Sequence, residues 1–261
     1  MGPLAKRRIP IKSPREIEAI RRSSAIVRDV LDAVSAMCAP GLTTAELDRA
    51  CGELIVARGG RSAFLGYRGF PGNCCISVNE EVVHGIGGAR RLQYGDIVKL
   101  DVGVMLDGWI GDSAVTVPVG VIAPATQRLL DVTEEALRLA IEQARPGNRV
   151  GDICHAVESS VTRHGYSVVR EFVGHGVGRR LHEEPQIPNY GAAGSGPELR
   201  PGMVLAIEPM VNEGRADIVY REDKWTVATA DGSLSAHFEH TVVVTEGDPE
   251  ILTCRERTIS R

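Results

Sequence analysis

Four acidic residues stand on or beside apolar, strand-like runs of this 261-residue chain. Asp101 and Asp112 lie in IVKLDVGVMLDGWIGDSAV, Glu208 follows MVLAI, and Glu239 lies in SAHFEHTVVV. A carboxylate on a buried strand costs several kcal/mol unless it is paired or bound to a cation. The pattern therefore predicts a cation site, and with it a metal-dependent enzyme.

Two histidines in the segment EFVGHGVGRRLHEEP add nitrogen ligands to this set. His175 stands between two glycines, which allow a backbone and a ligand to approach closely, and His182 follows after a turn. Oxygen-rich ligands with a neutral imidazole suit Mn, Fe, Co or Zn. Four carboxylates exceed the usual three protein ligands of a catalytic zinc, so two ions that share bridging carboxylates fit better. Such a pair activates water and polarises a carbonyl, which is the chemistry of hydrolysis. His84, in VVHGI, is a weaker candidate by itself.

The dipeptide Asp107-Gly108 predicts the tight turn of a β-hairpin. A two-residue turn there pairs Asp101 with Ala114 and Asp112 with Gly103. Both aspartates then lie on one face of the sheet as diagonal neighbours, roughly 5–8 Å apart. Glycine opposite Asp112 would leave room for an ion. The alternative is a pair of solvent-facing aspartates on an edge hairpin. Each glutamate taken singly also has an alternative: Glu208 could be a helix cap or part of an ion pair, and Glu239 could simply begin a strand.

Helices and strands must position these residues, and capping and turn signals mark the ends of four predicted helices. They cover about 14–39, 43–59, 124–145 and 150–164. Apolar and β-branched runs predict strands between and after these helices. The predicted strands are Cys74–Val78, Ile97–Met105, Ala114–Val119, Ser167–Phe172, Met203–Ile207, Trp225–Thr229 and His237–Val244.

A weak internal repeat connects the two halves of the chain. Pro40-Gly41 and Pro146-Gly147 are 106 positions apart, and each precedes a helix. LQYGDIVKLD then matches LRPGMVLAIE at an offset of 107, which places Asp101 on Glu208. Coincidence is the alternative, since few identities are involved. Duplication predicts a pseudo-two-fold α/β domain with the carboxylates meeting near the axis.

Composition excludes several classes of protein. The chain is 43% hydrophobic and 25% charged, with a net charge of −4, which argues against nucleic-acid binding. Six cysteines without a CxxC pair disfavour a structural zinc site and fit a reducing cytoplasm. We find no apolar run long enough to span a membrane and no secretory signal after the basic start. The Lys6-Arg7-Arg8 cluster suits a solvated tail, with docking at a polyanion such as the ribosome as the alternative.

The motifs, taken together, resemble one enzyme family. The order Asp101, Asp112, His175, Glu208 and Glu239 resembles the five-ligand signature of the pita-bread metallopeptidases. The resemblance narrows to bacterial type I methionine aminopeptidases and runs from about residue 13 to residue 252. The segments that carry it are FLGYRGFPGNCCISVNEEVVHGI, LDGWIGDSAVT, GHGVGRRLHEEPQIPNYG, LRPGMVLAIEPM, DKWTV and SAHFEHTVVVT.

The resemblance implies an α/β (α+β) pita-bread fold, with pseudo-two-fold duplicated halves and a curved antiparallel sheet covered by helices. We expect one catalytic domain over 13–254, between an N-terminal tail, 1–12, and a C-terminal tail, 255–261. By the resemblance, Asp101 chelates one metal, Asp112 and Glu239 bridge both, and His175 and Glu208 hold the other. The cofactor would be two divalent ions per chain, Co²⁺, Mn²⁺, Fe²⁺ or Zn²⁺.

The resemblance also assigns catalytic and binding roles. Glu208 would be the general base, His182 would hydrogen-bond the substrate carbonyl, and His84 would contact the scissile amide nitrogen. A monovalent cation is expected near Asn79 and Ser235. The family's methionine pocket maps onto Phe64, Tyr67, Phe70, Cys75, His84, Leu181, His182 and Trp225.

The pocket departs from the family's usual pattern at three positions. Phe64, Phe70 and Leu181 stand where cysteine, tyrosine and an aromatic residue are frequent. These replacements keep the pocket apolar, which suits the unbranched thioether of methionine. They affect the expected fine specificity and not the reaction.

The expected function is removal of the initiator methionine from nascent chains whose second residue is small, by a metal-bridged hydroxide that attacks the scissile carbonyl. The partners would be peptide or nascent-protein N-termini, with a transient ribosome contact, and the chain would be a cytoplasmic monomer. A proline-directed peptidase of the same fold is one alternative, but such enzymes usually have a sizeable N-terminal domain, and fewer than 100 residues precede Ile97. A metal-free binding module is the other, disfavoured because all five ligands are present.

Overall fold

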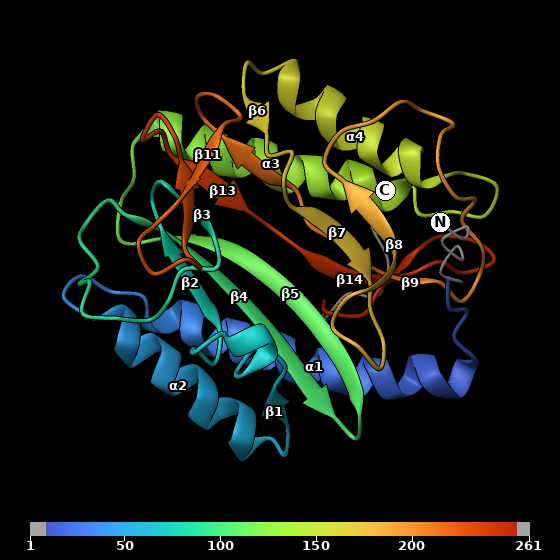
Figure 1. Cartoon of the computed structure of the whole chain (residues 1–261), viewed down its shortest axis with the longest axis horizontal. Helices are drawn as coiled ribbons and strands as arrows, with labels where there is room; N and C mark the ends of the chain where they lie inside the picture. Colours follow the sequence, from blue (N-terminus) through green and yellow to red (C-terminus); the bar gives the residue numbers. More distant parts are fainter. Residues whose placement is uncertain (1–8, 255–261) are drawn as a thin grey trace, which may run out of the picture.

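The computed structural model describes residues 9–254. Four α-helices lie in this range and flank a set of curved strands (Figure 1). They are α1 (Pro14–Met37), α2 (Thr44–Ala57), α3 (Pro124–Glu142) and α4 (Val150–Thr162). All four were predicted from capping and turn signals, and their positions are confirmed to within a few residues.

Capping boxes begin the first two helices where the sequence places them. The Ser13 hydroxyl accepts from the Glu16 amide, and the Glu16 carboxylate accepts from the Ser13 amide. Thr43 and Glu46 make the same reciprocal pair at α2. Each box satisfies amide donors that the first turn of a helix leaves without partners.

Two antiparallel sheets provide the surface on which the site is built. The first has the order β1-β4-β2, with β5 also paired to β4. The second has the order β15-β14-β9-β7-β8. A bridge between Ala114 and Glu239 joins them. The strands are β1 (Arg61–Ser62), β2 (Cys75–Val78), β4 (Ile97–Leu106), β5 (Trp109–Pro118), β7 (Val173–Gly176), β8 (Glu183–Pro188), β9 (Val204–Ile207), β14 (His240–Val243) and β15 (Glu250–Ile251).

Two smaller sheets and one 3₁₀ turn complete the described part of the chain. One sheet has the order β11-β12-β3 and the other β13-β10-β6. Their strands are β3 (Glu81–Val83), β6 (Ser167–Val168), β10 (Met210–Asn212), β11 (Ile218–Tyr220), β12 (Val227–Thr229) and β13 (Ser235–His237), and the 3₁₀ turn is η1 (Tyr67–Gly69).

The β4–β5 hairpin has the predicted register. Asp101 faces Ala114 and Gly103 faces Asp112, across a turn in which Asp107 and Gly108 both have positive φ. Residues on one side of β4 pack toward α1 and α2, where Leu100 and Val102 belong to a buried cluster with residues of both helices. Because side chains alternate along a strand, Asp101 and Gly103 face the opposite side.

Equivalent positions in the two halves have equivalent backbone conformations. Gly41 and Gly147, in the turns before the second helix of each half, have φ of 91° and 88°. Gly95 and Gly202, in the aligned repeat segments, have φ of 95° and 85°. Left-handed backbone at matching positions supports the duplication, because only glycine adopts it without strain.

The repeat extends to pairing between distant segments. Thr43 forms an isolated antiparallel bridge with Arg91, and Arg149 forms one with Glu198. The two bridges are related by offsets of 106 and 107 positions, the spacing of the sequence repeat. Each half has its own buried core, α1 and α2 on the first sheet and α3 and α4 on the second.

Four predicted strands differ from those observed. The predicted strand 114–119 is only the second half of β5, which already begins at Trp109. The predicted strand 167–172 ends after Val168 in β6, and the chain bends before β7. The predicted strand 225–229 begins only at Val227. The predicted strand 237–244 is two strands, β13 and β14, because Glu239 leaves that line and exchanges backbone hydrogen bonds with Ala114 of β5.

The chain ends fall partly outside the described residues. Residues 1–8 of the predicted N-terminal tail, with Lys6-Arg7-Arg8, and the predicted C-terminal tail, 255–261, lie there. Ile9 packs against the core of the second half, and Lys12 is buried in an ion pair with Glu183. No helix within residues 9–254 is long and apolar enough to cross a membrane.

Candidate metal centre and active site

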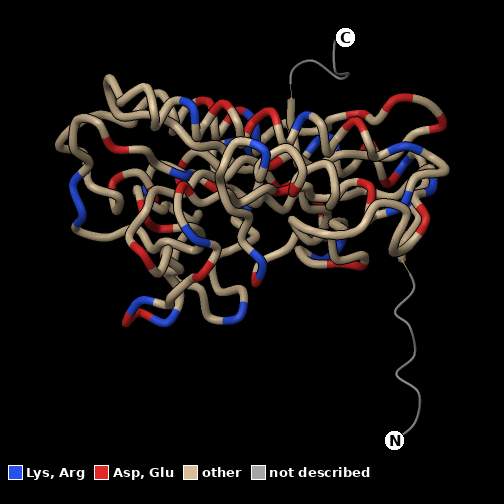
Figure 2. The backbone as a smooth tube through the Cα atoms, turned by 90° about the horizontal axis from the view of Figure 1, so that it is seen from above, with Lys and Arg blue, Asp and Glu red and all other residues tan. Residues whose placement is uncertain are grey.

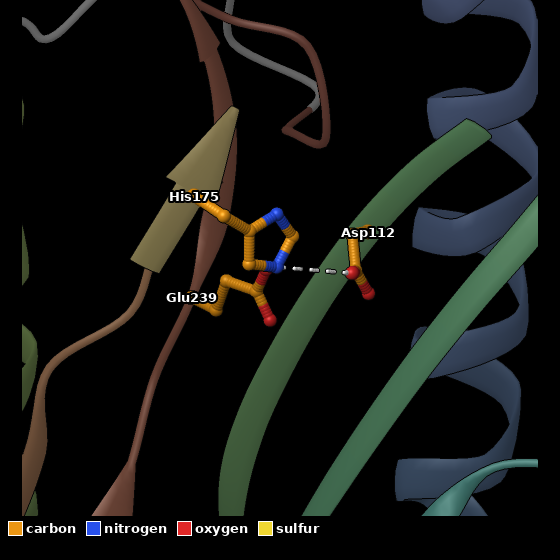
Figure 3. A group of neighbouring side chains, drawn as sticks. All are labelled: Asp112, His175 and Glu239. Carbon is orange, nitrogen blue, oxygen red and sulfur yellow. Dashed lines mark ion pairs between the residues drawn. The ribbon is translucent and has the colours of Figure 1, made fainter. Parts of the chain in front are cut away.

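The five predicted metal ligands lie on or directly beside separate strands and converge on one pocket. Asp101 is on β4, Asp112 on β5 and His175 on β7, while Glu208 directly follows β9 and Glu239 lies between β13 and β14. One ligand atom from each of Asp112, His175 and Glu239 lies within 4.8 Å of the others (Figure 3). His175 Nε2 is 3.4 Å from Glu208 Oε1 and 3.9 Å from Asp112 Oδ2.

Oxygen atoms at this centre lack partners in the described part of the protein. Asp101 Oδ1, Asp112 Oδ1 and Glu239 Oε1 are buried and accept no hydrogen bond. Burial raises the pKa of Asp101 to about 7, and burial together with neighbouring carboxylates raises the pKa of Asp112, Glu208 and Glu239 well above the usual range. Divalent cations would supply the missing positive charge and keep these carboxylates ionised. The donor set therefore fits metal ions.

His175 has the protonation state and tautomer of a metal ligand. Its Nδ1 lies 3.0 Å from the Gly176 carbonyl oxygen, which can only accept, so Nδ1 carries the proton. Burial lowers the pKa of the ring to about 3, which leaves it neutral. The lone pair of Nε2 then points toward the carboxylates, and the backbone carbonyl fixes the ring orientation.

Every residue predicted for the methionine pocket lines one cavity of about 260 Å³ beside this centre. Its wall is mainly aromatic and aliphatic: Phe70 contacts Trp225 edge to face, with ring centroids 5.2 Å apart. The predicted residues that line it are Phe64, Tyr67, Phe70, Cys75, His84, Leu181, His182 and Trp225.

Two further histidines face the cavity as neutral rings. His182 Nδ1 is 2.8 Å from the Tyr67 hydroxyl, and its ring centroid is 4.3 Å from that of His175. His84 packs edge to face on Phe172 at 5.1 Å. Burial lowers the pKa of His84 and of His182 to about 4.

Sequence reasoning missed seven residues that line the cavity: Arg68, Val83, Glu171, Phe172, Val173, Met210 and His237. Phe172 lies at the end of the predicted strand 167–172, and Met210 follows the predicted ligand Glu208 by two residues. His237 is buried, and neither of its ring nitrogens has a hydrogen-bond partner in the described residues. Its Nε2 lies 3.8 Å from Glu208 Oε2. Its place two residues before Glu239, in HFEH, was the available signal.

The sequence suggested that Gly103 leaves space for an ion beside Asp112, and this prediction is wrong. A Cβ at this position would lie 2.4 Å from Phe64 Cε1, so the ring of Phe64 fills the room beside Asp112. The expected monovalent-cation site also has an occupant. Lys99 Nζ donates to the carbonyl oxygens of Asn79 and Ser235.

Comparison with known proteins matches this geometry to one family. The model of metallopeptidase family M24 matches residues 18–246. The chain belongs to metallopeptidase family M24. This M24 chain is 49% identical to methionine aminopeptidase 1 of Bacillus subtilis, over 93% of its own length and 98% of that protein. It is 45% identical to methionine aminopeptidase of Escherichia coli K12, with 95% of each covered.

Solved structures place this M24 chain within a fold that is shared by several peptidases. A methionine aminopeptidase from Thermotoga maritima superposes with a TM-score of 0.93 at 46% identity, covering 94% of this chain and 99% of that one. A prolidase from Pyrococcus furiosus superposes with a TM-score of 0.78 at 25% identity, and only 66% of it is covered. The pita-bread fold is thus confirmed, and the similarity to methionine aminopeptidases extends over nearly the full length of both chains.

Proposed function

We infer that this chain is a methionine aminopeptidase, a metallo-exopeptidase that removes N-terminal methionine from peptides and proteins. The observation that carries this function is the convergence of the five predicted ligands, three of them with buried carboxylate oxygens that lack partners in the described residues, on a cavity whose remaining wall is mainly apolar. The similarity to methionine aminopeptidases over nearly the whole of both chains supports it. We propose nascent chains with a small second residue as the substrates.

We propose two divalent ions at the centre, of Co²⁺, Mn²⁺, Fe²⁺ or Zn²⁺. Asp101 would hold one ion, His175 and Glu208 the other, and Asp112 and Glu239 would be shared. The support is chemical, since four crowded carboxylates with raised pKa values exceed what one ion needs. When bound, such ions activate a water and polarise a carbonyl.

The apolar pocket would hold the methionine side chain. Phe70, Leu181 and Trp225 surround it with carbon surface, and Cys75 adds a polarisable sulfur. Burial and nearby acidic groups raise the pKa of the Cys75 thiol well above its usual value, so it remains a neutral lining group. A flexible thioether fits such a wall, whereas a charged side chain would lose its hydration without compensation.

Three residues would handle protons and charge in the reaction. The Glu208 carboxylate, which bound cations would keep ionised, lines the cavity and suits a general base that takes a proton from the attacking water. If the Tyr67 hydroxyl donates to His182 Nδ1, the ring carries its proton on Nε2 and can donate to the substrate carbonyl oxygen. We assign His84 to the scissile amide nitrogen, on the other side of the pocket.

The cellular location, oligomeric state and partners that we propose follow from the same function. We place the enzyme in the cytoplasm, where nascent chains emerge, and propose that it acts as a monomer with a transient ribosome contact. Positions of Lys and Arg are interspersed with positions of Asp and Glu along the described backbone (Figure 2), and the full sequence has a net charge of −4. Such a surface gives no sequence-specific nucleic-acid interface.

Peptide hydrolysis tests the function directly. Metal-stripped protein is assayed with Met-Gly-Met-Met and with Gly-Pro-Met, before and after addition of Mn²⁺ or Co²⁺. We expect methionine release from the first peptide only, and only with metal. Glu208→Gln should be inactive while Glu134→Gln, on the distant α3, keeps activity. Cleavage of the Gly-Pro bond instead would support the proline-directed alternative, and metal binding without any cleavage would support a binding module.

A further inference from the structure

Lys99 is a buried charged residue that the proposed reaction does not use. Its side chain is 1% exposed, the largest of the fully buried side chains in residues 9–254. It stands on β4, two residues before Asp101, and points away from the cluster formed by Leu100 and Val102. A buried lysine is costly unless its amino group has acceptors.

The amino group has two acceptors, both of them backbone carbonyls. Lys99 Nζ lies 2.6 Å from the Asn79 oxygen and 2.8 Å from the Ser235 oxygen. The Asn79 oxygen also accepts from the Ser235 amide at 3.1 Å, so both of its lone pairs are used. Burial lowers the pKa of Lys99 to about 7, but an amino group donates to carbonyls in either protonation state.

These contacts join three segments that carry active-site residues. Asn79, with a positive φ, forms the turn between β2 and β3, and the chain continues from β3 to His84. Ser235 begins β13, which leads to Glu239. Lys99 therefore connects the backbone on both sides of the pocket to the strand that carries Asp101.

Carbonyl oxygens from two segments also form the kind of site that binds Na⁺ or K⁺, and family resemblance places such an ion here. The residues present do not fit it, because the amino group already lies within hydrogen-bond distance of both oxygens. We propose that Lys99 replaces a bound monovalent cation with a covalently attached amino group, and so makes the active centre independent of Na⁺ and K⁺. Lys99 is then a positioning residue for the Asn79 turn and β13.

The test compares salts of equal ionic strength: NaCl, KCl and tetramethylammonium chloride, whose cation is too large for the site. The melting temperature and the kcat for Met-Gly-Met-Met with Mn²⁺ are measured in each salt. We expect the wild type to give the same values in all three. Wild-type crystals soaked in Rb⁺ should show no anomalous peak between the Asn79 and Ser235 carbonyls.

Two substitutions distinguish the effect of losing the Lys99 amino group from the effect of losing its aliphatic side chain. Lys99→Ser leaves space that an ion can enter, whereas Lys99→Met fills the space without a donor. In tetramethylammonium chloride both should melt lower than the wild type. In KCl or NaCl, Lys99→Ser should regain about 5–10 °C at cation concentrations near 100 times Kd, with a parallel recovery of kcat. Lys99→Met should regain nothing.

Three results would overturn the proposal. The first is a wild-type melting temperature or kcat that rises specifically with Na⁺ or K⁺. The second is a Rb⁺ peak at the two carbonyls. The third is a folded Lys99→Ser protein without cation-specific recovery. If Lys99→Ser fails to fold in every salt, the salt dependence of the wild type and the Rb⁺ soak still test the proposal. The proposal concerns positioning, so hydrolysis of a different peptide would refute the proposed function but leave the melting temperatures and the Rb⁺ result unchanged.

Discussion

Gly103→Ala tests whether the position of the Phe64 ring requires a residue without a side chain at position 103. The added Cβ would lie 2.4 Å from Phe64 Cε1 and 3.0 Å from Cδ1 and Cζ. Ordinary carbon contacts are about 3.5–4.0 Å, so the ring must shift by about 1 Å. Overpacking of this kind costs about 1–3 kcal/mol. A strand glycine changed to alanine would otherwise gain about 0.5–1 kcal/mol from backbone entropy, so the two effects have opposite signs.

Thermal unfolding of matched variants measures which effect dominates. The net cost of the two effects is about 0.5–2 kcal/mol. Each kcal/mol shifts the melting temperature of a domain of this size by about 2–4 °C, so Gly103→Ala should melt roughly 1–8 °C lower. Gly247→Ala is the control, because nothing lies within 4 Å of its added Cβ. Adding Gly103→Ala to Phe64→Val should cost far less, with a coupling free energy of about 1–3 kcal/mol.

Kinetics of the same variants report on the pocket. A ring displaced from Gly103 moves into space that the substrate side chain needs, so KM for Met-Gly-Met-Met should rise in Gly103→Ala. The reasoning would be refuted if Gly103→Ala were as stable as Gly247→Ala, or if its cost were the same with Phe64→Val as with the native ring.

The remaining predictions concern the catalytic histidine, proton release and an ion pair. His182→Ala should lower kcat about 10²–10³-fold with the fold retained, as for loss of an oxyanion donor; an unchanged kcat removes His182 from that role. Because burial raises the pKa of Asp101 to about 7 while His175 is already neutral, Mn²⁺ must displace carboxyl protons. Its affinity should therefore rise from pH 6 to pH 8, and calorimetry in buffers of different ionisation enthalpy should show proton release; a pH-independent affinity contradicts the carboxyl assignment. Lys12→Met should destabilise by about 3–5 kcal/mol in urea unfolding, since it leaves the buried Glu183 carboxylate unpaired; a loss under 1 kcal/mol contradicts that.

Local patterns in the sequence predict the framework of the site well. The Asp107-Gly108 turn determines the hairpin register, which in turn places Asp101 and Asp112 on one face. Capping boxes and proline-glycine turns likewise mark the four helices, because these signals act within a few residues.

Contacts between distant segments could not be derived from such patterns. Phe64 fills the space at Gly103, and Glu239 leaves a continuous apolar run to pair with Ala114. The amino group of Lys99 lies between two carbonyls that are more than 150 residues apart in sequence. In each case tertiary packing determines which residues are in contact, so the contact cannot be predicted from neighbouring residues in the sequence.

Anomalous diffraction from crystals soaked in Mn²⁺ tests the central claim, that five residues on or beside separate strands form a two-ion centre. The account predicts two peaks about 3.5–4 Å apart, with Asp112 and Glu239 contacting both. Asp101 should contact only one ion, and His175 and Glu208 only the other. A single peak at saturating Mn²⁺, or peaks away from these five residues, would contradict it.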